Sequence, residues 1–287
     1  MDKRGSVISF LNMKGGVGKT TLCKEMALFL SEFNKDNNKI LVIDIDPQSN
    51  CTQSFFEKYN IMQIDDSLFE KDKLPSISKV FSSSVTRQST LDEVIIKLTD
   101  TLHLLPGDLD TVFMERETST GAAEQKLLNF IMENKLKEKY DYIFIDCPPT
   151  YSFYTVSALL SSDYYFVPVK PDAYSVLGLD LLERVVRELK KGYRIFFEHK
   201  PITNLGVIFT MVGGTSIQGF RRNIESIKSS FASKDIYFFT NEFRKIDRLA
   251  TGKLSTFIVD RDDSLLLDDV RSICMEFEER VVRLSER

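Results

Sequence analysis

The chain has 287 residues, enough for one large domain or two small ones, and 43% of them are apolar. No apolar run approaches the roughly 18 residues of a membrane span. The first residues show neither the apolar core nor the cleavage site of a signal peptide, so we expect a cytoplasmic protein. The four cysteines are widely spaced and form no C-x-x-C pair. This spacing indicates reduced thiols rather than a disulfide framework or a zinc site.

Charge is distributed unevenly along the chain. The formal net charge is −4, which taken alone argues against a nucleic-acid binder. Between residues 184 and 253, however, there are 14 Lys and Arg against 6 Asp and Glu, a local balance of +8. This asymmetry indicates either a polyanion-binding surface or an ordinary solvated face, and composition does not distinguish the two.

Short apolar runs that end in polar or turn residues predict six buried strands. In chain order they span residues 6–13, 39–46, 102–107, 140–149, 164–170 and 205–211. Between them, apolar side chains recur at helical spacing in residues 18–33, 122–139 and 177–191. Residues 55–91 are less regular, and residues 76–90 are predicted to be a loop. Buried strands alternating with amphipathic helices predict a mostly parallel, doubly wound α/β sheet with helices on both faces, in a single domain over residues 1–287.

The segment NMKGGVGKTTL lies between the first predicted strand and the first predicted helix, which is the context of a phosphate-binding loop. Its glycines allow the backbone to curl with its N–H groups inward, and the helix adds its positive end. We expect Lys19 to neutralise the β- and γ-phosphates of a nucleotide and the Thr20 hydroxyl to hold Mg²⁺. The alternative is a glycine turn that binds nothing. The expected nucleotide-binding residues are Gly15, Gly16, Val17, Gly18, Lys19, Thr20 and Thr21.

The loop departs from the ordinary pattern G-x-x-x-x-G-K-[ST], because Met13 stands at the first glycine position and Lys14 directly precedes the glycines. K-G-G-V-G-K-T resembles the deviant Walker A motif of the ParA/MinD family of P-loop ATPases. In that family two subunits enclose two ATP molecules, and the first lysine of each subunit reaches the phosphates in the other's site. The resemblance implies that Lys19 serves its own ATP, that Lys14 serves the partner's, and that the ATP state is a homodimer.

Two further segments resemble motifs of the same family. In KILVIDIDPQSNCT the resemblance implies that Asp46 positions the attacking water and that Asp44 lies near the Mg²⁺ shell. The alternative for Asp46 is that it caps the turn before Pro47. YDYIFIDCPPT resembles the Walker B strand, which implies that Asp146 holds Mg²⁺ through water. The neighbouring Cys147 is interpreted as a packing residue, with redox sensing as the alternative.

Softer matches favour the ParA branch, of the Soj type. VPVKPDAYSVLGL resembles its V-P-V-x-P/A segment, and Pro171 is carried over as a nucleotide contact. LHLLPGDLD, LGVIFTM and RLATGKLSTFIVD resemble other segments of these proteins. The usual I-P-R-N near the adenine is replaced by FRKI, residues 243–246, so the resemblance assigns no base contact there.

The ParA resemblance also implies non-specific DNA binding by the ATP dimer, through basic residues far from the nucleotide. Arg187 falls where this branch carries a DNA-contacting arginine, and Arg184, Lys190 and Lys191 lie one or two turns away on the predicted helix. An ordinary solvated helix is the alternative. Phosphate contacts alone predict weak, salt-sensitive affinity. The resemblance further implies slow ATP hydrolysis stimulated by a ParB-like protein, and a location at the nucleoid in the DNA-bound state.

A MinD-like ATPase that cycles on a membrane is one alternative function. It needs a terminal amphipathic helix with basic flanks. An apolar stripe does occur near the C-terminus, but glutamates dominate the middle of its polar face, so we predict core packing and no stable membrane association. The stripe consists of Ile273, Phe277, Val281 and Leu284.

A regulatory module that holds ATP with little hydrolysis and positions some other cargo is a further alternative. The presence of both Lys14 and Asp46 argues against an inactive enzyme. The sequence names no cargo.

Overall fold

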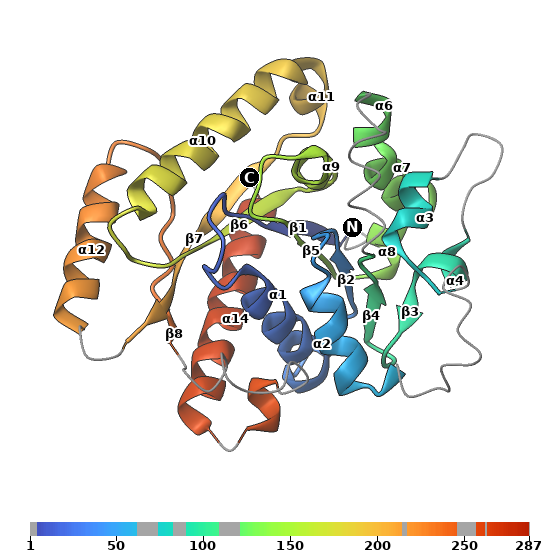
Figure 1. Ribbon diagram of the computed structural model, residues 1–287, viewed down its shortest axis with the longest axis horizontal. Coiled ribbons are helices and arrows are strands. Elements are labelled where there is room, and N and C mark those ends of the chain that lie inside the picture. The colour runs from blue at the N-terminus through green and yellow to red at the C-terminus, as the bar shows by residue number, and fades with distance from the viewer. Residues whose placement is uncertain are drawn as a thin grey trace.

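The computed structural model of the chain describes residues 5–61, 74–82, 90–108, 121–213, 217–245, 257–261 and 263–286. The strands in these ranges form one sheet with the order β3-β4-β2-β5-β1-β6-β7-β8 (Figure 1). Every neighbouring pair is parallel except β3 with β4, which is antiparallel. The strands are β1 (Ser6–Phe10), β2 (Ile40–Asp44), β3 (Ile96–Lys97), β4 (Leu102–Leu105), β5 (Tyr142–Asp146), β6 (Tyr164–Val169), β7 (Thr203–Val212) and β8 (Phe243–Arg244).

Two apolar cores lie on opposite faces of this sheet, because alternate strand residues point to opposite sides. In Figure 1, α9 and α10 lie above the strands, and α1 and α14 lie below them. The first core packs against α3 (Ile77–Ser82), α7 (Lys126–Glu133), α9 (Phe153–Ser161), α10 (Ser175–Gly192), α11 (Arg194–His199) and α12 (Ile217–Ser230). The second packs against α1 (Lys19–Leu28), α2 (Asn50–Lys58) and α14 (Ser264–Ser285). The predicted mostly parallel α/β sheet with helices on both faces is confirmed. The single-domain boundary stays a prediction.

The helices differ from prediction in three places. The loop predicted over residues 76–90 is wrong in its first part, because α3 forms there and buries Ile77, Val80 and Phe81 at helical spacing. The serine-rich composition of this segment obscured that spacing. The helix predicted over 122–139 is divided into α6 (Gly121–Glu124), α7 and α8 (Leu136–Lys139), and Lys135 has a left-handed φ of 51° before α8. The first predicted helix is α1 followed by a π-helical turn, Phe29–Phe33.

The C-terminal helix α14 packs in the second core. Ile273 and Phe277 are fully buried and Val281 is 6% exposed, so the predicted core packing of this stripe is confirmed. In the part of the chain that the structure describes, no helix combines the length and apolar character needed to cross a bilayer. All four cysteine thiols are buried and unbridged. The remaining short elements are α4 (Leu91–Val94) and a 3₁₀ turn, Ile258–Asp260.

Candidate functional site

The loop between β1 and α1 curls because two of its glycines have left-handed backbones. Gly16 has a φ of 67° and Gly18 a φ of 85°, conformations that strain residues with a Cβ. The middle of the loop is tied to the sheet, since Thr210 on β7 donates a 2.6 Å hydrogen bond from its hydroxyl to the Val17 carbonyl. Val17 is buried, whereas Gly15 and Gly16 are exposed. The glycine part of the loop is therefore accessible to a ligand while its centre is fixed.

Helix α1 begins at Lys19, so Lys19, Thr20 and Thr21 form its first turn, which contains no acidic residue. The unpaired N–H groups and the positive end of the helix dipole favour an anion here. Lys19 is only 6% exposed. Burial lowers its pKa, although the negative charge of Asp146 counteracts the shift. Its Nζ donates a 3.4 Å hydrogen bond to the carbonyl of Lys14. The ammonium is thus held within the loop and beside buried carboxylates.

Two buried carboxylates lie at the same edge of the sheet. Asp44 ends β2 and Asp146 ends β5, and the two residues are register partners in these parallel strands. Burial raises the pKa of Asp44 to about 6. Burial, and then the negative charge of Asp44, raises the pKa of Asp146 well above its usual range. This edge therefore concentrates negative charge that needs a cation when both acids are ionised.

Asp146 has the properties of a metal-binding carboxylate. Both of its oxygens are buried, and neither accepts a hydrogen bond of ordinary geometry from any described residue. The Thr20 hydroxyl lies beside this carboxylate and favours its charged form. Carboxylate and hydroxyl oxygens are ligands that Mg²⁺ prefers, usually completed by water and substrate phosphates. Among the described residues no group of three or more His, Cys, Asp or Glu could hold a metal alone. The residues therefore fit a Mg²⁺ ion that shares its ligands with a phosphate.

Asp44 is engaged differently from Asp146. Its Oδ2 accepts hydrogen bonds from the backbone N–H and the hydroxyl of Thr52, at 2.9 and 2.8 Å. Its Oδ1 accepts a 3.2 Å bond from the backbone N–H of Asp46. The same Thr52 hydroxyl accepts a 2.7 Å bond from Gly107. Asp44 therefore organises the turn between β2 and α2, and its predicted place near a Mg²⁺ shell stays a prediction.

Asp46 is half-buried and lies close enough to Lys19 that its charge raises the lysine pKa against the effect of burial. Its Oδ1 accepts a 3.0 Å hydrogen bond from the backbone N–H of Gln48. The turn cap considered as an alternative is therefore present, together with proximity to the loop lysine. Both interpretations of Asp46 remain open to experiment. Cys147 is fully buried, and burial raises its thiol pKa well above the usual range, which favours packing over redox sensing.

Lys14 lies at the rim of the loop and contacts its own subunit. Its Nζ forms an ion pair with Asp172, which lies between β6 and α10. Its backbone N–H donates a 2.9 Å bond to Asn12 Oδ1, and the Asn12 amide donates a 2.7 Å bond to the Pro168 carbonyl. Pro171 is buried in the same connection. The structure thus brings the predicted residues Lys14 and Pro171 to one corner of the loop. The ion-pair partner of Lys14 there, Asp172, was not among the predicted site residues.

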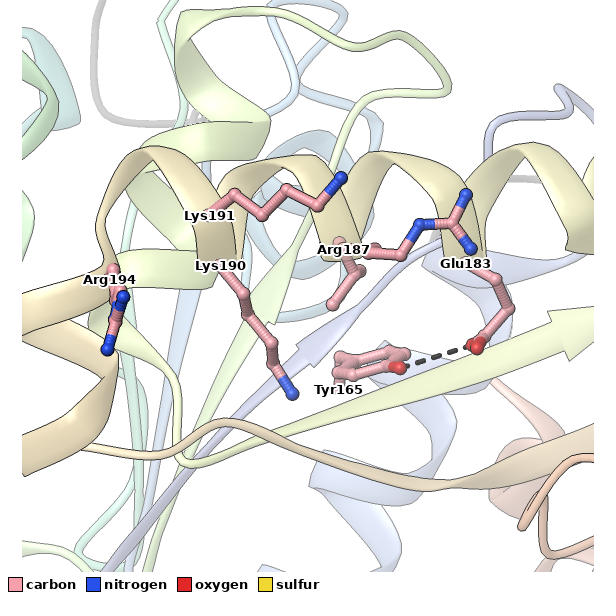
Figure 2. A pocket seen from close by; sticks show the side chains of 7 residues that line it. Tyr165, Glu183, Arg187, Lys190, Lys191 and Arg194 are labelled. Atoms are coloured by element: carbon pink, nitrogen blue, oxygen red, sulfur yellow. Dashed lines mark hydrogen bonds between the residues drawn. The ribbon is translucent and has the colours of Figure 1, made fainter.

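The predicted DNA-contacting residues lie on α10, remote from this loop in sequence. A hollow of about 350 Å³ lies beside the second half of α10, and Figure 2 shows the side chains that line it. Tyr165 and Glu183 line it together with four basic side chains: Arg187, Lys190, Lys191 and Arg194. Glu183 accepts a 3.2 Å hydrogen bond from the Tyr165 hydroxyl. The hollow therefore carries an excess of positive charge, which suits an anion such as a phosphate.

The basic residues around the hollow are not equivalent. The Lys190 ammonium donates a 2.8 Å hydrogen bond to the Ile202 carbonyl, so it is partly committed to the fold. Arg187 lies along the helix with a 62% exposed side chain. Arg184 is exposed on α10 but does not line the hollow. Arg194 was not predicted from the sequence, because it follows Gly192, where α10 ends. Its spacing of seven residues from Arg187, about two helical turns, could have identified it.

Several predicted segments lie partly outside the described residues, among them residues 83–89 of the predicted loop and residues 109–110 of LHLLPGDLD. Of FRKI, the first two residues form β8 and residue 246 is outside the description. Of RLATGKLSTFIVD, residues 248–256 are outside it as well.

Comparisons with known proteins agree with this architecture. A family model for an AAA domain matches residues 5–198. The chain is 36% identical over 187 residues to an uncharacterised protein of Methanocaldococcus jannaschii, covering 65% of this chain and 67% of that protein. It is 29% identical over 231 residues to the sporulation initiation inhibitor protein Soj of Bacillus subtilis, covering 80% and 81%. The chain belongs to the ParA/MinD family of ATPases.

A solved structure extends the similarity to the whole fold. A proposed plasmid partition protein of Borrelia burgdorferi B31, bound to AMPPNP, superposes with a TM-score of 0.70 at 25% identity, covering 97% of this chain and 100% of that one. The resemblance inferred from the loop, the two aspartate motifs and the ParA-type segments is therefore confirmed at the level of the ParA/MinD family.

Proposed function

We propose that this chain binds MgATP, hydrolyses it, and works as a ParA-type positioning ATPase in plasmid or chromosome segregation. The observation that carries the proposal is the convergence of Lys19, Thr20 and the orphaned Asp146 carboxylate at the mouth of the glycine loop. The similarity to a Borrelia protein solved with AMPPNP supports the choice of nucleotide.

Each residue of this corner has a role in the proposed site. The loop amides and Lys19 bind the phosphates, and Thr20 and Asp146 would hold Mg²⁺. The metal neutralises phosphate charge when it is bound. Asp46 orients the attacking water, since it lies near Lys19 on a turn that Asp44 fixes. Hydrolysis is slow in the isolated protein and is stimulated by a ParB-like partner.

Lys14 supplies the dimer-dependent part of the mechanism. A second lysine is redundant if both serve one nucleotide, because Lys19 already occupies the loop. A cation that arrives from the partner only on dimerisation stabilises phosphate charge and connects assembly to nucleotide state. The ATP state is therefore a nucleotide-sandwich homodimer in which each Lys14 reaches the other subunit's phosphates.

A mixing experiment tests this arrangement. Lys14→Ala and Asp46→Ala chains should each hydrolyse ATP poorly alone. In their heterodimer one site has its own Asp46 and receives an intact Lys14, while the other site lacks both, so part of the activity returns on mixing. If Lys14 serves its own nucleotide, each site lacks one group and mixing restores nothing. A purely additive rate, together with normal dimerisation of Lys14→Ala, would reject the trans role.

The DNA-binding part of the proposal rests on the basic residues of α10. Arg187, with its neighbour Arg184, faces solvent on this helix, and the hollow in Figure 2 adds Lys191 and Arg194. Exposed lysine and arginine side chains suit contacts with phosphates rather than base readout, so affinity for DNA is non-specific and depends on salt. The alternative of a membrane-cycling MinD-like function is weakened, because the C-terminal apolar stripe is buried in the core.

A further inference from the structure

A second hollow, of about 450 Å³, lies at the edge of the sheet opposite the phosphate loop. It is lined by the first residues of β1, β6 and β7, by the end of α14 and by the residue that follows α11. The phosphate loop follows the other end of β1, and a strand of five residues is roughly 16 Å long. A small molecule in this hollow is therefore too far away to contact the phosphates of a nucleotide. We call it the Lys200 hollow, and its titratable described residues are Lys137, Asp163, Tyr164, His199 and Lys200.

Two lysines in the Lys200 hollow share one carboxylate. Lys137 Nζ donates a 3.0 Å hydrogen bond to Asp163 Oδ1 and lies 2.9 Å from Oδ2. Asp163 Oδ2 also accepts a 2.8 Å bond from the backbone N–H of Val7. Lys200 Nζ is farther away, at 3.9 Å from Oδ1. Asp163 is thus committed mainly to Lys137 and Val7, and the two ammoniums together outweigh its single negative charge.

Lys200 is the less well compensated of the two cations. Its side chain is 25% exposed, and its Nζ donates a 2.6 Å hydrogen bond to the Ser162 carbonyl. A neutral amine can also donate to a carbonyl, so this bond does not require the charged form. The Phe196 ring, whose centre lies 6.0 Å from Nζ, gives the cation only weak support at that distance.

The environment therefore favours the free amine of Lys200. Burial lowers the pKa of Lys200 to about 8; the charge of Asp163 acts against this shift, and the charge of Lys137 adds to it. At pH 7.5 such an amine is free in roughly a quarter of the molecules, against about a thousandth for an ordinary lysine.

The other two titratable residues of the hollow leave this balance in place. Burial, and then the charge of Asp163, raises the pKa of Tyr164, so its hydroxyl is neutral at pH 7.5. His199 is exposed, and its Nδ1 lies 2.8 Å from the Ile195 carbonyl of its own helix. Solvent screens any charge on this ring.

We propose that Lys200 is a nucleophilic lysine and that the Lys200 hollow is a modification site for small acyl phosphates. The Lys200 nitrogen attacks the acyl carbon, the new N–C bond forms, and the C–O bond to the phosphate breaks. The phosphate leaves with the electron pair of that bond, and the amine proton passes to solvent. Lys137 attracts the phosphate group of the reagent, because it lies in the same hollow with only part of a carboxylate to balance it. The site does not depend on the proposed ATPase function.

The first test is the rate of acetylation by acetyl phosphate at each lysine of the full chain, at pH 7.5, followed by peptide mass spectrometry. Lys97 and Lys191 are the references, since their side chains are 62% and 66% exposed and each pairs with a nearby carboxylate. Lys200 should react about tenfold faster than either reference. This advantage is smaller than the ratio of free amines, because a less basic amine is a weaker nucleophile and the hollow restricts access. A rate no higher than that of the references would overturn the proposal.

The pH profile tests the cause of the reactivity. The rate at Lys200 should level off above a midpoint near pH 8, while the rates at Lys97 and Lys191 continue to rise. Lys137→Met keeps the length of the side chain and removes its charge, so Asp163 then stabilises the Lys200 ammonium more fully. The midpoint should move up and the rate at pH 7.5 should fall about threefold.

Lys139→Met is the matched control for Lys137→Met. Lys139 lies on the same helix, α8, and is exposed, but it does not line the hollow. This variant removes the same charge and should leave the Lys200 profile unchanged. An unchanged midpoint in Lys137→Met, or an equal shift in both variants, would contradict the role of the shared carboxylate.

A second reagent tests the preference for a phosphate. N-hydroxysuccinimide acetate transfers the same acetyl group but carries no charge. The preference for Lys200 over the reference lysines should persist with this reagent and be about threefold smaller than with acetyl phosphate, the effect of one partly exposed cation on an anion. Equal preferences would reject acyl phosphates as the favoured class. None of these measurements uses ATP, so a failure of the proposed ATPase function would leave their outcome unchanged.

Discussion

The phosphate-loop edge of the sheet and the basic side of α10 both gather charged residues, but they do so under opposite conditions. At the loop, Lys19 is 6% exposed and Asp146 is fully buried. On α10 and α11 the side chains of Arg187 and Arg194 are 62% and 80% exposed. A buried charge lacks water to solvate it, so its partners decide its energy, whereas an exposed charge is screened by salt and is worth little alone. Single substitutions should therefore have large effects at the loop and small, salt-dependent effects on α10.

The largest effect is expected for Lys19→Ala. Removing the buried cation leaves the phosphates of bound ATP without their main counter-charge, a loss of about 3–5 kcal/mol, or roughly a thousandfold in affinity. Equilibrium binding of labelled ATP measures this. Lys14→Ala is the matched control in the same loop and should keep near-normal binding. Unchanged affinity in Lys19→Ala would remove this lysine from the site and would erase the contrast with α10.

Asp46 separates a chemical role from a structural one. Asp46→Ala should bind ATP and dimerise but hydrolyse about a hundredfold more slowly, since positioning the water stabilises the transition state. Asp46→Asn is the sharper variant, because its amide oxygen can still accept the hydrogen bond from Gln48 that caps the turn. Turnover measured under single-turnover conditions should fall in both variants. Wild-type turnover in Asp46→Asn would leave only the turn cap.

Asp146→Asn should stabilise the nucleotide-free protein while it removes Mg²⁺ binding. Burial raises the pKa of Asp146 in the folded state, so the native form binds a proton more tightly than the unfolded chain does. This contribution to stability is fully present below the unfolded-state pKa, and it falls as pH rises from there to the folded-state pKa. At pH 7.5 with a chelator, the neutral, isosteric amide should raise Tm by about 2–4 °C, corresponding to roughly 1 kcal/mol. The gain should shrink toward pH 5. With MgATP the order of the two Tm values should reverse. A lower Tm of the variant without ligand would contradict the cost of the buried charge, and equal stabilisation of both proteins by MgATP would contradict the metal role.

The smallest effect is expected on α10. Arg187→Ala should weaken DNA binding by the ATP-bound protein about threefold and reduce the slope of log affinity against log salt by about 1, with nucleotide affinity unchanged. Arg271→Ala is the control, since Arg271 is also exposed but lies on α14, across the sheet. Fluorescence anisotropy with random-sequence duplex DNA at several salt concentrations measures both quantities. If the ATP-bound wild type ignores DNA at low salt, positioning of a protein cargo replaces DNA partition.

The sequence predicted the sheet and the loop well because both depend on short-range patterns. Apolar runs of strand length located the central strands, and the carboxyl ends of parallel strands meet at one edge, which brought Asp44 and Asp146 together. The errors fall where the pattern was weak. The helix α3 lies in a serine-rich segment, and β3 and β8 are two residues long, too short for any alternation to be read.

By itself the sequence determined the deviant loop and the family, because glycine spacing and a following helix fix local backbone geometry. Which residues bind phosphate and Mg²⁺ stays a prediction from the same pattern. The tertiary structure decided which groups distant in the chain meet. Lys14 and Asp172 are 158 positions apart, and the hollow beside α10 joins residues of β6, α10 and α11. Such contacts follow from how strands and helices pack rather than from any local pattern. Only the fold could therefore show that the loop's first lysine is held by its own chain.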